Sequence, residues 1–83
     1  MERKYKKDYD EAFRDEQVAW FEDRMDRLPE SMQINAATYA PDLRLTVRNL
    51  ILTLRKNKTN VTFSGYMETL LKIREKLEAE QGL

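Results

Sequence analysis

The stretch from Pro41 to Leu54 is the most apolar part of the chain, and its spacing predicts a helix with two apolar faces. At about 100° per residue, five of its side chains fall within an arc of about 100°, the width of a core-facing stripe. They are Leu43, Val47, Leu50, Ile51 and Leu54. Leu45 and Leu52 lie seven residues apart on nearly the opposite side. Such a helix must be enclosed in a bundle or shared with a partner.

A preceding helix is predicted from Asp8 or Asp10, either of which suits an N-cap, to about Arg27. Its large apolar side chains follow a period between three and four residues: Phe13, Trp20, Phe21, Met25 and Leu28. Carboxylates mark its outer face at Glu11, Asp15, Glu22 and Asp26. The acidic start of this helix lacks the Gly and the Glu that a calcium-binding loop requires. We therefore interpret the carboxylates as a solvated helix face.

Between these two helices the apolar spacing changes from helical to alternating. Leu28-Pro29-Glu30-Ser31 indicates a turn, and the alternation from Met32 to Ala37 predicts one short extended segment laid across the bundle. The apolar helix then begins at Pro41 or Asp42 and ends near Asn57, after two cationic residues that suit a helix C-terminus.

The third helix is predicted to begin at Thr62 or Ser64, after a polar connector, and to run to about Glu80. Its apolar stripe alternates spacings of three and four residues and comprises Phe63, Tyr66, Leu70, Ile73 and Leu77, widened by Met67 and Leu71. Arg74 lies within that stripe, and a charge among apolar side chains needs a partner. We expect the acidic first helix to supply it.

Together these elements predict an all-α fold, a compact three-helix domain with a short extended segment before the second helix. In this interpretation residues 1–83 form a single domain, and residues 1–7 form a flexible basic arm. A chain of this size conceals only about 60 to 65% of its unfolded surface, so we expect a small stability. The sequence shows no signal-peptide pattern and no run of apolar residues long enough to span a membrane, which favours a cytoplasmic location.

The net charge is zero, with 15 basic and 15 acidic side chains, but the distribution is uneven. Residues 8–30 carry three basic and nine acidic side chains, a sum of −6. Residues 31–62 carry five basic and one acidic side chain, a sum of +4. An acidic first helix and a basic second helix can compensate each other within one fold. Because nucleic-acid-binding domains usually present an uncompensated basic face, this pattern disfavours nucleic acid as a partner.

No catalytic residue is predicted. The chain has no Cys and no His, which removes the thiolate and imidazole ligands of metal sites and the commonest general base. With only Gly65 and Gly82, it also has no glycine-rich loop for phosphate. We therefore expect no enzyme activity, no metal site and no cofactor.

The sharpest functional hypothesis is a protein-binding surface on the second helix. Arg44, Arg48 and Arg55 line one side of that helix, and Leu45 and Leu52 line the neighbouring side. A few apolar side chains rimmed by arginine are typical of protein interfaces. The expected partner is a second copy of the chain or another protein.

A structural interpretation competes with this hypothesis. Met32, Ile34 and Tyr39 of the extended segment, or the first helix, can cover the two leucines from within the chain. The leucines would then complete the core and take no part in binding.

A regulator of the ribbon-helix-helix class is the alternative function, because it also places a strand before two helices. Gln33 and Asn35 would then face outward as base readers. The candidate strand carries no Lys or Arg, which weakens this hypothesis. A helix-turn-helix is disfavoured further, because the third helix has no basic residue from Phe63 to Thr69 and Glu68 would repel phosphate.

A set of short motifs runs from Leu28 to Leu77. It comprises Leu28-Pro29-Glu30, Ile34-Asn35-Ala36-Ala37-Thr38, Asp42, Asn60, Thr62-Phe63, Tyr66 and Met67-Glu68-Thr69-Leu70-Leu71-Lys72-Ile73. In these motifs the chain resembles a family of small bacterial proteins known only as a domain of unknown function. Family members favour Pro where this chain has Gly65, and the charged extension to about Arg14 lies outside the resemblance. The resemblance implies a short helical domain and supplies no activity, ligand or catalytic residue.

Overall fold

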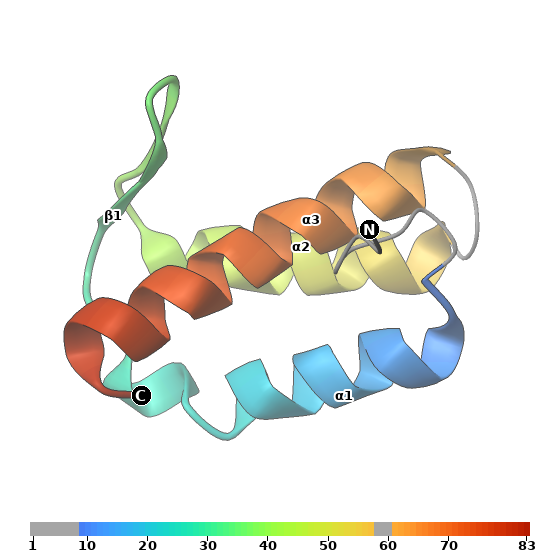
Figure 1. Cartoon of the computed structure of the whole chain (residues 1–83), viewed down its shortest axis with the longest axis horizontal. Coiled ribbons are helices and arrows are strands. Elements are labelled where there is room, and N and C mark those ends of the chain that lie inside the picture. The colour runs from blue at the N-terminus through green and yellow to red at the C-terminus, as the bar shows by residue number, and fades with distance from the viewer. Residues whose placement is uncertain (1–8, 58–60) are drawn as a thin grey trace, which may run out of the picture.

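The described part of the chain folds into three α-helices and one small sheet, drawn in Figure 1. The computed structural model describes residues 9–57 and 61–83, so the expected basic arm at 1–7 and residues 58–60 of the polar connector lie outside the described residues. In chain order the elements are α1 (Glu11–Glu22), a 3₁₀ turn η1 (Met25–Arg27), β1 (Met32–Asn35), β2 (Thr38–Ala40), α2 (Leu43–Lys56), α3 (Val61–Lys76) and a π-helical turn η2 (Leu77–Gln81). The prediction of three helices is confirmed.

The helices pack side by side, and the small sheet projects from one end of them (Figure 1). Helix α2 packs against α3, α1 contacts both, and β1 contacts α3. The C-terminus lies beside the end of α1, where Arg24 Nε donates to the carbonyl of Leu83 at 3.3 Å. Because α1 contacts α2, the acidic and the basic helix are neighbours, as the charge pattern predicts.

Aspartate side chains cap the first two helices. Asp10 Oδ1 accepts from the backbone N–H of Phe13 at 2.8 Å, and Asp42 Oδ1 accepts from that of Leu45 at 3.2 Å. Each bond satisfies one of the amide groups that a helix N-terminus leaves without an intrahelical partner. The predicted start at Asp10 and the predicted limits of the second helix are confirmed.

Two other predicted helix limits are wrong. Helix α1 ends at Glu22 and not near Arg27, and Arg24 leaves the helical backbone conformation with φ −117° and ψ 7°. The Arg24 side chain then satisfies the helix end, since Nη1 donates to the carbonyl of Trp20 at 3.0 Å. Helix α3 begins at Val61, so neither of the two predicted capping residues precedes it.

The expected single extended segment is a β-hairpin. Its two strands pair antiparallel, with Gln33 opposite Tyr39. The chain reverses after Asn35, whose Oδ1 accepts from the backbone N–H of Ala37 at 2.9 Å. Gln33 Nε2 donates to the carbonyls of Asn35 at 2.7 Å and Thr38 at 3.2 Å, which ties the two strands together. Because the sequence has no Asn-Gly or Asp-Gly pair here, the alternation alone did not predict the turn.

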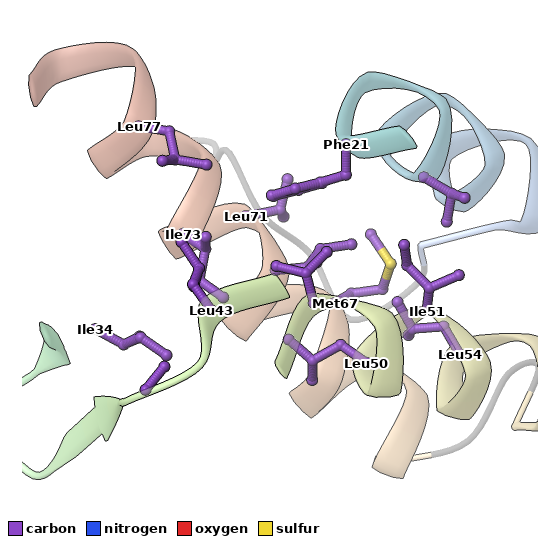
Figure 2. Packing of buried hydrophobic residues seen from close by; sticks show 14 of the residues in the cluster. Phe21, Ile34, Leu43, Leu50, Ile51, Leu54, Met67, Leu71, Ile73 and Leu77 are labelled. Carbon is purple, nitrogen blue, oxygen red and sulfur yellow. The ribbon is translucent and has the colours of Figure 1, made fainter. Parts of the chain in front are cut away.

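The core is formed by side chains from all three helices and from the hairpin. Figure 2 shows Phe21 of α1, Met67 of α3 and Ile34 of β1 directed into this shared interior. The predicted inner stripe of α2 is confirmed, because each of its members is at most 7% exposed: Leu43, Val47, Leu50, Ile51 and Leu54. This interior fixes which side of α2 faces solvent.

The groups that contact the Arg74 guanidinium differ from those that we predicted. Its Nη1 donates to Gln17 Oε1 at 2.9 Å, and its guanidinium lies 4.7 Å from the ring centroid of Trp20. The carboxylate comes from Glu78 on the following turn, with 3.2 Å between Nε and Oε2. Helix α1 supplies an amide and an aromatic ring instead of a carboxylate, because its carboxylates lie on the opposite, exposed side.

Candidate functional site

The side of α2 that faces away from the core carries all five residues of the predicted binding surface. We define the α2 outer face as Leu45 and Leu52 with Arg44, Arg48 and Arg55, all of which are exposed. Leu45 is 50% exposed and Leu52 is 55% exposed. The remaining leucine, isoleucine and valine side chains of the same helix are buried. These five side chains therefore form a continuous exposed strip along α2.

No described residue conceals the two leucines. Met32 and Ile34 are buried in the core, because β1 packs against α3. Tyr39 is itself 57% exposed. The interpretation in which the extended segment or α1 covers Leu45 and Leu52 is therefore wrong for residues 9–57 and 61–83.

The arginines of the α2 outer face are held to different degrees. Arg44 Nε donates to the carbonyl of Met25 at 2.8 Å. Arg55 Nη2 lies 3.5 Å from Oε2 of Glu22 in an exposed ion pair. Arg48 forms no hydrogen bond or ion pair with any residue in the described part of the chain. Exposed ion pairs stabilise a fold by at most about 1 kcal/mol, so a partner can recruit these cations at little cost.

A second exposed surface lies on α1, beside the carboxylates that the sequence predicts as a solvated helix face. Ala12 and Ala19 are exposed and seven residues apart, on the side of α1 opposite its buried residues. Glu16 and Asp23 lie beside them and are also exposed. We define the α1 outer face as these four residues. The sequence shows that the two alanines and the two leucines have the same seven-residue spacing. Only the exposure of these side chains in the structure shows that both pairs face solvent.

Two further carboxylates border the α1 outer face and are paired within the chain. Asp15 Oδ1 lies 2.8 Å from Nη2 of Arg14, and Glu22 is the partner of Arg55. Arg14 is itself buried, with Nη1 at 3.5 Å from the carbonyl of Leu54 near the end of α2. The Glu22–Arg55 ion pair and the contact of Arg14 with the Leu54 carbonyl join α1 to α2, whereas the Arg14–Asp15 pair lies within α1.

An open hollow of about 450 Å³ lies at the base of the hairpin. It is lined by Leu28, Pro29, Glu30, Pro41, Asp42 and Arg44. Its polar groups have structural roles, because the carbonyl of Glu30 accepts from the N–H of Leu43 at 2.9 Å and Asp42 caps α2. Its lining contains no nucleophile with an adjacent base.

Two searches of the described residues bear on metals and membranes. No three acidic side chains in residues 9–57 and 61–83 gather closely enough to hold a metal ion. Over the same ranges, no helix combines the length and the apolar character needed to cross a bilayer.

The family model of a domain of unknown function, DUF6965, matches residues 15–79. The chain belongs to this family. The match begins directly after Arg14, where the resemblance placed the end of the charged extension, and it includes α1, the hairpin, α2 and α3. It therefore extends further toward the N-terminus than the motifs beginning at Leu28. No curated protein and no solved structure matches the chain.

Proposed function

We propose that this chain is a small intracellular module that acts through protein contacts, with the α2 outer face as its binding surface. The observation that carries the proposal is that Leu45 and Leu52 are each about half exposed while the rest of the apolar surface of α2 is buried. Two large apolar side chains one heptad apart, with arginines beside them, suit the packing of a partner helix. The proposed activity requires neither catalysis nor a cofactor.

The size of the surface suits a reversible contact. Burying a whole leucine side chain stabilises by roughly 2 kcal/mol, so concealing the exposed halves of Leu45 and Leu52 contributes about 2 kcal/mol in total. The 14 residues of α2 extend over only about 21 Å. Because permanent interfaces are much larger, the partner must add charged contacts, and the complex should dissociate readily.

The ribbon-helix-helix alternative has no structural observation in its favour. That class pairs strands between two chains, whereas β1 pairs with β2 of its own chain. The side chains of Gln33 and Asn35 bond within the hairpin. Binding to duplex DNA stays a prediction, and a mobility-shift measurement at low salt tests it.

Site-specific photo-crosslinking in the cells that produce the protein tests the proposed function. A benzophenone amino acid at position 52 should form covalent adducts with protein after irradiation, because a bound partner would cover Leu52. The matched control carries the same amino acid in place of Lys72, which is exposed on α3. Adducts at position 52 and none at position 72 support the proposal.

The same experiment has a clear negative result. Equal labelling at both positions, or no protein adduct at position 52, would overturn the α2 outer face as a binding surface. Loss of the position 52 adduct in an Arg48→Glu background would show further that the arginines contribute to the contact.

A further inference from the structure

We infer that the α2 outer face binds a second copy of this chain, through the α1 outer face of that copy. This inference rests on the proposed function and names its partner. It follows from the charges, sizes and spacing of the two surfaces.

Charge excludes the simplest pairing, in which two copies place their leucines against each other. Helix α2 carries four basic side chains, Arg44, Arg48, Arg55 and Lys56, and no acidic one. A symmetric contact between two α2 helices would bring these like charges together, which costs free energy at an interface. The partner surface must therefore be acidic.

The α1 outer face has that charge. Within α1 the basic residue, Arg14, is buried, whereas Glu16 and the adjoining Asp23 are exposed. Neither Glu16 nor Asp23 forms an ion pair with any residue in the described part of the chain. On α2, neither Arg48 nor Lys56 forms an ion pair with any described residue. The α2 outer face and the adjoining Lys56 thus offer a partner two unpaired positive charges, and the α1 outer face offers two unpaired negative charges.

Size and spacing also match. The leucines at 45 and 52 and the alanines at 12 and 19 are both seven residues apart, which is roughly 10 Å along a helix. Each pair lies at the centre of its exposed side, with the charges beside it. Small side chains let another helix approach closely, so large leucines can pack over the alanines while the charged rims meet.

Charge-reversal variants test this pairing. The first variant is Arg48→Glu with Lys56→Glu on α2, and the second is Glu16→Lys with Asp23→Lys on α1. All four positions are exposed, so both variants should fold, which circular dichroism checks. Light scattering over rising concentration should show association of the unaltered chain, and association at least about tenfold weaker for each variant alone.

Mixing the two variants should restore association. In the mixture, the glutamates introduced at positions 48 and 56 of the first variant meet the lysines introduced at positions 16 and 23 of the second, and the unaltered faces of the two proteins also remain complementary. For the unaltered chain, raising the salt from about 0.05 M to about 0.5 M should weaken association, because salt screens attraction between exposed charges. A contact between two basic α2 helices would respond in the opposite direction.

Three results would overturn the inference: an unaltered chain that stays monomeric, a second variant that associates as strongly as the unaltered chain, or a mixture that fails to associate. These results are distinguishable from failure of the proposed function. Crosslinking at position 52 to a different protein would preserve the binding surface and exclude the second copy. An adduct of twice the chain mass supports both.

Discussion

The two sides of α2 carry the same kind of residue and meet opposite surroundings. On the inner side Leu43 and Leu54 are fully buried. On the outer side Leu45 and Leu52 are half exposed, although Leu52 is only two residues from Leu54. The difference arises because α1 and α3 both pack on the inner side of α2. Residue type shows where apolar surface exists, and the placement of neighbouring elements decides which part of it water reaches.

The largest difference in stability is expected between the variants Leu54→Ala and Leu52→Ala. Both changes remove the same atoms from the same helix and alter helix propensity equally. Leu54→Ala should lower the free energy of unfolding by about 3 kcal/mol, because it leaves a cavity in the core. Leu52→Ala should lower it by less than about 1 kcal/mol, since half of that side chain is already in water. Urea denaturation measures both values, and equal losses would contradict the assignment of the two sides.

The next largest effect on stability is expected at the N-terminus of α2, because both sides of the helix depend on how it begins. Asp42→Ala removes the side-chain acceptor for the N–H of Leu45 and should destabilise the fold by about 1 kcal/mol. Asp42→Asn retains an acceptor and should lose less than half of that amount. Thermal unfolding of the two variants compares them, and an equal loss would show that charge and not capping is responsible.

Arg74 on α3 is the opposite case to Leu45 and Leu52. It is a charged residue within an apolar stripe, whereas they are apolar residues on an exposed side. Arg74→Lys should cost about 0.5 to 1 kcal/mol, because an ammonium cannot stack over Trp20 while bonding both Gln17 and Glu78. The emission of Trp20, the single tryptophan, should shift as well. Lys72→Arg is the control, and an identical shift there would assign the effect to charge at a distance.

The smallest effect on stability is expected for Leu45→Lys combined with Leu52→Lys. Because both positions are about half exposed and the methylene stem of each lysine can replace the buried half of the leucine, the free energy of unfolding should change by less than about 0.5 kcal/mol. Association should be lost, since the α2 outer face would then lack its apolar centre. Urea denaturation and light scattering on the same samples separate the two outcomes. An unfolded double variant would show that the leucines serve the core.

Local signals explain what was predictable. Asp10 and Asp42 start helices because a short acceptor side chain satisfies a free amide, and this depends on neighbours three residues away. The inner stripe of α2 follows from helical periodicity in the same way. The turn after Asn35 was missed because it depends on side-chain bonds and not on a glycine signal. The end of α1 was misplaced because a long arginine side chain, Arg24, closes the helix early.

The sequence by itself determined three helices, an apolar inner stripe on α2 and the positions of Leu45, Leu52 and their arginines around that helix. Tertiary structure alone decided that the hairpin packs Met32 and Ile34 against the core, and that α1 offers Arg74 an amide and a ring. It also decided that both leucines stay open to solvent. The physical reason is the distance along the chain over which each effect acts. Helix caps and helical periodicity depend on residues within one or two turns, whereas the burial of a side chain depends on where distant segments pack.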